Sequence, residues 1–303
     1  MTLAASTPLD DSTEPTGTAR VQVSDGSASW GQRIRPFLRP QIIIGAAVVM
    51  LWVLVIVFAA ILSPHDPFAP SGPRLQPPST DHLLGTDALG RDVLSRVLYG
   101  ARQSLPIALI TITVSAAVGG VVGAIAGFFG GPVDAVLMRV ADITMAFPSI
   151  LLAMAVTAAL GPGLTHAFIA IVVVWWPIYA RLIRGQILSI KEREHVVAAE
   201  AIGMRRLSIL RKHVLPHSTT PVMVNATTDL GTIIILIASL SFLGLGALPP
   251  APEWGAMITE GTANFYQWWI AAGPGVAMVS IVLAVNFLGD GLRDVFHLRG
   301  GNR

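Results

Sequence analysis

The sequence predicts an all-α integral membrane protein with six transmembrane helices and both termini on the cytoplasmic side. Composition is the first reason: 53% of the 303 residues are hydrophobic and 13% are charged, whereas about a quarter of an average soluble domain is charged. The second is the length of the apolar runs, because a bilayer core of ~30 Å takes about 20 helical residues to cross. The third is the position of the basic residues between these runs.

Six apolar runs are long enough to cross a bilayer. They cover residues 42–62, 105–129, 143–160, 167–183, 222–245 and 269–288. The first run carries no charge and exceeds the about 7–15 apolar residues of a cleaved signal peptide, so we expect it to remain as a span. A soluble helical core is the alternative, but helices that are apolar on all sides are typical of membranes.

Small residues and prolines inside the runs predict how the spans pack. Gly119, Gly123 and Gly127 follow a small-xxx-small spacing that lets two helices approach closely. Pro148 and Pro177 fall within spans, where kinks are tolerated if neighbours satisfy the freed carbonyls.

Basic residues set the orientation, because Lys and Arg in short loops stay on the cytoplasmic side. With a cytoplasmic N-terminus, sixteen of the twenty Lys and Arg residues fall inside. The other four are Arg74, Arg91, Arg96 and Arg102, in the first external loop. Because the positive charge flanks membrane spans, it does not indicate nucleic-acid binding.

The spans divide the chain into a tail and a membrane domain. Residues 1–30 are rich in Ser, Thr, Asp and Gly and predict a disordered cytoplasmic tail. Residues 31–303 form the transmembrane domain, with an external loop at 63–104 and a basic cytoplasmic loop at 185–220. Trp254, Trp268 and Trp269 fit an aromatic belt at the outer interface.

The cytoplasmic loop predicts two short helices. The first covers 192–202, with Val196, Val197, Ala199 and Ile202 able to line one side, and Gly203 stands where a left-handed C-cap is favoured. The second follows at once and stops at Pro216. A short amphipathic helix of this kind can seat in a groove of another protein or lie on anionic lipid, and composition alone favours neither.

The external loop predicts a turn and a short amphipathic helix. Gly85 and Gly90 mark the turn, Asp87 or Asp92 can cap the helix, and Val93, Leu94, Val97 and Leu98 form its apolar stripe. The helix either anchors the second span at the outer interface or contacts a docking protein.

The cytoplasmic loop resembles the EAA loop, E-A-A-x-x-x-G-x(9)-I-x-L-P, of the membrane subunits of bacterial ABC importers. The matching residues are Ala198, Ala199, Gly203, Leu215 and Pro216. Val197 stands where the pattern has Glu, which leaves open whether Glu194 or Glu200 supplies the acidic contact.

A second stretch resembles the LGTDxxGRDxxSRxxYGARxSL signature of the C-type permeases of dipeptide, oligopeptide and nickel importers. It carries Gly85, Thr86, Asp87, Gly90, Arg91, Asp92 and Arg96. Together the two resemblances cover about residues 33–300.

The resemblance implies the type I ABC importer permease fold, in a multi-pass subunit of the bacterial inner membrane. Such a subunit pairs with a homologous permease, rests on two cytoplasmic ABC ATPases and receives substrate from an extracytoplasmic solute-binding protein. The substrate class is di- or oligopeptides, with nickel chelates and glutathione as alternatives. ATP and Mg would be bound by the ATPases, since this chain has no GxxxxGK[ST] phosphate loop and no cofactor of its own is expected.

Polar residues on the fifth run suggest a translocation path. Asn225, Asp229 and Thr232 share one helix face, and an ionisable residue within a span normally faces a bundle interior or a wet cavity. The alternative is polar contact between neighbouring helices.

Other function classes have less support. The chain has no cysteine, and its seven histidines form no metal-spaced pair on one helix, so neither a disulfide nor a metal centre is expected. A membrane enzyme would need a convergent catalytic cluster. A secondary transporter, the other alternative, would ordinarily show broken helices repeated in two halves.

Overall fold

The computed structural model describes residues 40–204, 206–209 and 215–300. The regular structure of these residues is helical, and the bridge between Thr86 and Asp92 belongs to no strand. The predicted tail at 1–30 lies outside the described residues.

Ten helices are described, and all but α2 follow the loop that begins at residue 63. They are α2 (Pro40–Leu62), α3 (Val93–Phe129), α4 (Gly131–Met145), α5 (Ser149–Leu160), α6 (Leu164–Lys191), α7 (Glu194–Ala201), α8 (Arg206–Ile209), α9 (Leu215–Phe242), α10 (Trp254–Ala263) and α11 (Trp269–Gly300).

Five of these helices are long and apolar enough to span a membrane: α2, α3, α6, α9 from Pro221, and α11 from Trp269 to Val295. Helices α4 and α5 make a sixth only as a bent pair, because they meet at 91°. The span predicted over 143–160 is therefore divided between two helices at its proline, and a sixth span is not confirmed. Pro148 lacks an amide hydrogen and disfavours the helical conformation in the residue before it, so the helix ends at Met145 and a new one begins at Ser149.

The second span also differs from its prediction. The amphipathic stripe that begins at Val93 is not a separate interfacial helix but the first turns of α3, which continues through Pro106 to Phe129. Asp92 caps this helix, accepting a hydrogen bond of 2.8 Å from the Ser95 amide. The external loop therefore leads into the membrane helix without a hinge.

Close packing of α3 on α6 depends on glycine. A Cβ atom at Gly119 would lie 2.2 Å from the Trp176 carbonyl oxygen, and one at Gly123 would lie 2.2 Å from that of Ala180. One turn further on, a Cβ at Gly127 would lie 3.1 Å from the Arg184 carbonyl oxygen. The small-residue spacing therefore serves helix packing, as predicted.

The predicted aromatic belt is wrong for two of its three tryptophans. Trp254 is fully buried and donates a hydrogen bond of 3.0 Å to the Val97 carbonyl, while Trp269 donates one of 3.2 Å to that of Thr86. These indoles tie α10 to the start of α3, and α11 to the loop that precedes α3. Trp268 alone of the three is exposed.

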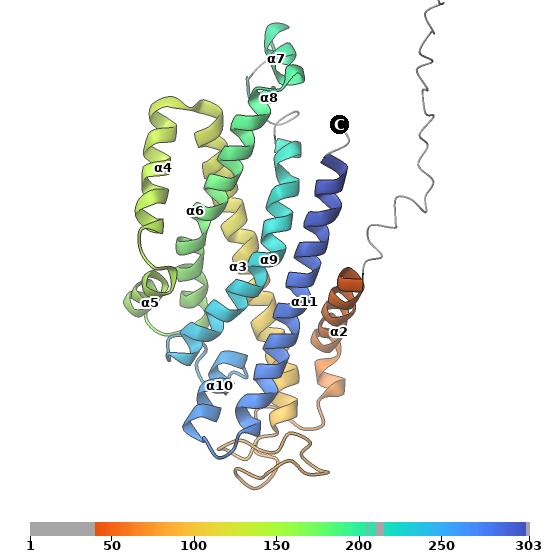
Figure 1. The fold of residues 1–303 in the computed structure, drawn as a ribbon. Coiled ribbons are helices and arrows are strands. Elements are labelled where there is room, and N and C mark those ends of the chain that lie inside the picture. Colours follow the sequence, from red (N-terminus) through yellow and green to blue (C-terminus); the bar gives the residue numbers. More distant parts are fainter. Residues whose placement is uncertain (1–39, 205, 210–214, 301–303) are drawn as a thin grey trace, which may run out of the picture. The chain divides into compact units, whose positions relative to one another are not determined.

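The two loops singled out by their sequence lie at opposite ends of the bundle. Helices α7 and α8 extend beyond one end of α6, and residues 63–92 pack beside α10 at the other end (Figure 1). The last turns of α11 lie at the α7 end (Figure 1). The long helices therefore connect two structurally distinct ends.

Candidate functional site

Helix α7 is held against the bundle along one side. Val196 on α7 and Ile209 on α8 are buried, and they join a cluster with Phe128 of α3 and with Ile187 and Ile190 of α6. Gly203, between the two short helices, has φ +78°. The left-handed cap predicted at this glycine is confirmed, and it turns the chain so that both helices pack on the same core.

The other side of α7 is open. Glu194, Ala198 and Gly203 are exposed, and Ile202 is 79% exposed. The prediction that Val196 and Ile202 line one side of a helix is therefore wrong, because Val196 is buried whereas Ile202 lies beyond the end of α7 and is exposed. Among the described residues, no atom would lie within 4 Å of a Cβ at Gly203, so the space beside this glycine is open.

The remaining residues of the loop that resembles the EAA loop are only partly described. Val197, Ala199 and Glu200 lie in α7, and Leu215 and Pro216 begin α9, but their side chains lie outside the described part. Pro216 occupies the first turn of α9, a position where a proline needs no amide partner. Residues 210–214, most of the second predicted helix, are not described.

Ion pairs connect the long helices near the end of the bundle that carries α7. The Arg184 guanidinium of α6 donates to both carboxylate oxygens of Asp134 on α4, with the Nη2–Oδ2 distance at 2.6 Å. Arg181 Nη2 donates to one carboxylate oxygen of Asp142, and the Lys191 ammonium donates to the Phe128 carbonyl at the end of α3 over 2.7 Å. These basic residues, whose positions in the sequence predicted the orientation of the spans in the membrane, thus also connect α3, α4 and α6.

At the opposite end, two carboxylates and two arginines form a network. Asp87 Oδ2 lies 2.6 Å from Arg91 Nε and 3.4 Å from Arg96 Nε, and Arg91 Nη2 lies 3.3 Å from Glu260 Oε2 on α10. Asp87, Arg91 and Arg96 are buried. Burial, and then the nearby charge of Asp87, raise the pKa of Glu260 above its ordinary value.

The glycines of this segment are required by its shape. Gly85 and Gly90 have φ +68° and +79°. A Cβ atom at Gly85 would lie 2.4 Å from the Gln76 carbonyl oxygen, and one at Gly90 would lie 2.4 Å from that of Gly72. No other residue fits either position without moving the backbone.

All seven residues of the predicted external-face motif are buried: Gly85, Thr86, Asp87, Gly90, Arg91, Asp92 and Arg96. Their side chains bond to one another, to α10 and to backbone carbonyls. They build a rigid segment, and the surface of that segment is provided by other residues, such as Leu83 and Leu89.

The three predicted path residues do not share one environment. Asp229 accepts hydrogen bonds of 2.8 Å from the Tyr179 hydroxyl and 3.4 Å from the Trp175 indole, both on α6. The Asn225 amide donates to the Pro221 carbonyl over 2.9 Å, while Thr232 is exposed. Asp229 thus makes the polar contact between helices that the sequence left as an alternative.

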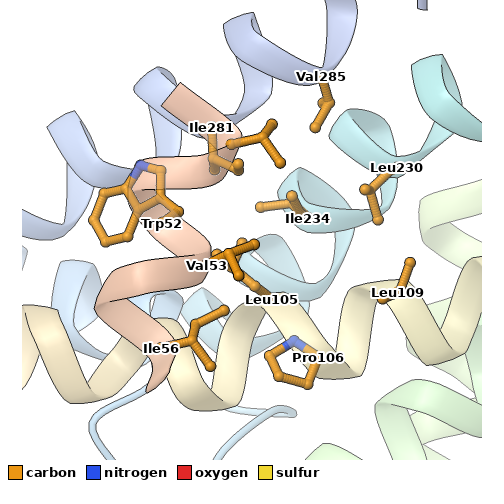
Figure 2. Close-up of a pocket in the computed structure, with 11 residues that line it drawn as sticks. Trp52, Val53, Ile56, Leu105, Pro106, Leu109, Leu230, Ile234, Ile281 and Val285 are labelled. Atoms are coloured by element: carbon orange, nitrogen blue, oxygen red, sulfur yellow. The ribbon is translucent and has the colours of Figure 1, made fainter. Parts of the chain in front are cut away.

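An apolar pocket of about 260 Å³ lies between α2, α3, α9 and α11. Trp52, Ile56, Pro106 and Ile234 are among the residues that line it (Figure 2). Its lining residues include Leu230 but not the neighbouring Asp229. This pocket offers no polar group for a peptide, so it is not the candidate path.

Sequence reasoning missed the partners of several predicted residues. Glu260, Tyr179 and Trp175 are distant in the chain from the residues they contact. No local signal marks such pairs, because helix packing alone brings them together. The same holds for His65, His82 and Asp92, whose side chains lie close together at the external end.

Comparison with known proteins identifies the family. The sequence model described as "Binding-protein-dependent transport system inner membrane component" matches residues 119–299, more than half of the chain. The chain belongs to this family. It is an ABC importer permease subunit of the peptide family, a multi-pass membrane protein.

Curated relatives align over most of the permease. The probable D,D-dipeptide transport system permease protein DdpC of Escherichia coli is 40% identical over 267 residues, which is 87% of this chain and 89% of the relative. The dipeptide transport system permease protein DppC of Alkalihalophilus pseudofirmus is 43% identical over 83% of this chain and 84% of its own length. The glutathione transport system permease protein GsiD of Pectobacterium atrosepticum is 39% identical over 88% and 89%.

A solved structure shares the fold. The inward-facing MetNI methionine ABC transporter matches with a TM-score of 0.55 and 22% identity, over 66% of this chain and 96% of the matched chain. At this identity the likeness concerns the fold, that of a type I ABC importer permease.

Proposed function

We propose that this permease forms half of the translocation path of an ATP-driven importer for short peptides, paired with a second, homologous permease. Two cytoplasmic ATPases would supply the energy, and an extracytoplasmic solute-binding protein would deliver the peptide. The names of the relatives, which refer to D,D-dipeptides, dipeptides and glutathione, support a short-peptide substrate. The chain itself is a non-catalytic subunit that holds no ATP or Mg.

The observation that carries this proposal is the two-sided environment of α7. Val196 fixes the helix to α3 and α6 through one side, while Glu194 and Ala198 on the helix, and Ile202 just beyond its end, are exposed. A helix fixed on one side and open on the other can transmit a push from a partner into the long helices. The ATPases would contact this open side, with Ala198 and Gly203 admitting close approach.

At the other end, the rigid segment supports a docking surface for the solute-binding protein. Leu83 and Leu89 are 61% and 50% exposed, and Phe265 and Tyr266 are 82% and 87% exposed. Large exposed apolar side chains on an ordered frame are typical of protein interaction sites. The buried Asp87–Arg91–Arg96–Glu260 network holds this frame in shape.

The path would follow the face of α9 that carries Thr232. Thr232 and Ile235 are exposed in the single chain. The second permease would lie opposite this face, so that the path runs between the two subunits. Asp229 would not line the path, but it would stabilise the position of α9 by bonding to α6. Thr232, not Asp229, is therefore the residue proposed to face the substrate.

Cysteine cross-linking tests the coupling surface, because the chain has no cysteine of its own. Ala198→Cys and Ile202→Cys should form cross-links to the ATPase subunit in the assembled transporter. Leu89→Cys, at the opposite end, is the control and should form none to the ATPase. Cross-links from Leu89→Cys to the ATPase, or none from either α7 variant, would overturn the proposal.

A further inference from the structure

Three side chains that are distant in sequence meet beneath the external segment. The His82 Nδ1 atom lies 2.9 Å from Asp92 Oδ1, and His65 Nδ1 lies 3.9 Å from the same oxygen. All three ligand atoms lie within 4.8 Å of one another. His65 follows α2, His82 lies in the loop, and Asp92 caps α3, so the cluster joins the ends of the first two long helices.

One nitrogen in this cluster lacks a partner. His65 Nδ1 is buried and makes no hydrogen bond, although the His65 ring itself is about one-third exposed. A buried polar atom without a partner is costly, and such atoms are uncommon in folded proteins. The lone pair of this nitrogen is therefore available to a ligand that approaches between the two rings.

The surrounding bonds orient the other two groups. Asp92 Oδ2 accepts from the Ser95 amide at 2.8 Å and from the Ser95 hydroxyl at 2.6 Å, which leaves Oδ1 for the imidazoles. The Ser95 hydroxyl also accepts from the His65 amide at 3.1 Å. Carboxylates that bind metal ions are typically held in place by additional hydrogen bonds of this kind.

The surroundings of His82 set the position of its ring. A Cβ atom at Gly72 would lie 2.6 Å from His82 Nε2, so the absence of a side chain at residue 72 makes room for the ring. The His82 amide donates to the Ser79 hydroxyl at 3.1 Å. The ring therefore presents Nδ1 to the cluster from a fixed position.

We propose that His65, His82 and Asp92 bind a late first-row divalent cation, with Zn²⁺ as the favoured ion. Two imidazole nitrogens and one carboxylate oxygen form a three-ligand set that zinc accepts, with water in a fourth position. Two ligand atoms of a tetrahedral zinc ion lie about 3.3 Å apart, so the cluster, whose ligand atoms lie within 4.8 Å of one another, must contract by up to about 1.5 Å. The partly exposed His65 ring is the group that can move.

Access for the ion and its water is present beside His65. This residue lines an open cavity of about 460 Å³, together with Ser63, Asp66 and Tyr99. The bound ion would join the end of α2 to the start of α3 and so restrain the external segment. The metal site lies at the external end alone and is independent of the ATPase contact.

Metal binding to the full chain tests the site directly. The chain would carry a tag without histidine and be reconstituted in lipid nanodiscs, and Zn²⁺ would be titrated by calorimetry. We expect one Zn²⁺ per chain and a rise in melting temperature when Zn²⁺ is added. Mg²⁺ and Ca²⁺, which prefer oxygen ligands, should bind far more weakly.

The decisive variant is His65→Ala, because His65 Nδ1 has no hydrogen-bond partner whose loss would unfold the loop. It should weaken zinc binding by more than about 100-fold, beyond the 10–100-fold that loss of an outer-shell partner costs. The melting temperature without metal should stay unchanged. His166→Ala is the matched control, because His166 bonds to the Gly161 carbonyl outside the cluster, and it should bind zinc normally.

Two results would overturn the proposal. One is the absence of stoichiometric Zn²⁺ binding to the wild-type chain; the other is equal zinc affinity in wild type and His65→Ala. X-ray absorption of the zinc-loaded protein gives a separate check, since two imidazoles should coordinate the ion at about 2.0 Å. A spectrum with oxygen ligands alone would contradict the assigned residues.

Discussion

The Tyr179 hydroxyl donates a hydrogen bond of 2.8 Å to the Asp229 carboxylate, which joins α6 to α9 within the membrane domain. The Trp175 indole, one helical turn earlier, approaches the same carboxylate at 3.4 Å. An ionisable residue within a span is thus tied to aromatic donors on the neighbouring helix. This contact fixes the orientation of α9 against α6, and therefore also which face of α9 points away from α6.

Loss of this carboxylate should weaken the contact between α6 and α9. Asp229→Ala leaves the Tyr179 hydroxyl without its partner, and interhelical hydrogen bonds in membranes contribute about 1 kcal/mol each. Asp229→Asn keeps an acceptor and should lose less. Thermal unfolding in nanodiscs would measure both, and equal melting temperatures for wild type and Asp229→Ala would contradict the structural role.

Valine at Gly203 should abolish uptake while leaving membrane insertion intact. Gly203 has φ +78° and open space around it, so the cost is backbone strain of about 1–2 kcal/mol and not a steric clash. Gly244→Val is the matched control, because Gly244 has φ +77° and equally open surroundings at the other end of the bundle. Peptide uptake by proteoliposomes should be lost in the first variant and kept in the second.

Alanine at Gly123 should destabilise the bundle, whereas alanine at Gly120 should not. The new methyl group at residue 123 would lie 2.2 Å from the Ala180 carbonyl oxygen, so α3 and α6 would have to separate. Overpacking of this kind typically costs about 1–3 kcal/mol. At Gly120 no atom lies within 4 Å, and alanine should be neutral or stabilising by about 0.5–1 kcal/mol. Unfolding measurements that rank the pair in the opposite order would contradict the packing.

Glu260 should make the external segment less stable as pH rises. Its pKa in the folded protein is raised above the ordinary 4.5, chiefly by burial. The folded state then holds the proton more tightly than the unfolded state. The resulting stabilisation is present below pH 4.5 and is lost as pH rises toward the folded pKa.

Glu260→Gln should flatten this dependence, because the amide does not titrate. The melting temperature of both proteins can be followed from about pH 4 to about pH 8. Asp81→Asn, which changes an exposed carboxylate of the same loop, is the control and should keep the wild-type profile. An unchanged profile in Glu260→Gln would show that another group is responsible.

Much of the membrane architecture could be predicted from local sequence. The long apolar runs became α2, α3, α6, α9 and α11, because apolar length is a property of each segment alone. Gly203 adopted its left-handed cap because glycine meets little resistance there. The break at Pro148 was foreseen only as a kink, since the size of a bend depends on what the two halves pack against.

What the sequence alone determined is therefore the membrane class, the family motifs and the residues that need special backbone conformations. Tertiary structure decided which side of α7 is buried, that the external motif points inward to Glu260, and that Asp229 bonds to Tyr179. It also brought His65 and His82 to Asp92. The physical reason is that helical periodicity acts over a few residues, whereas partners this far apart along the chain meet only when the helices pack.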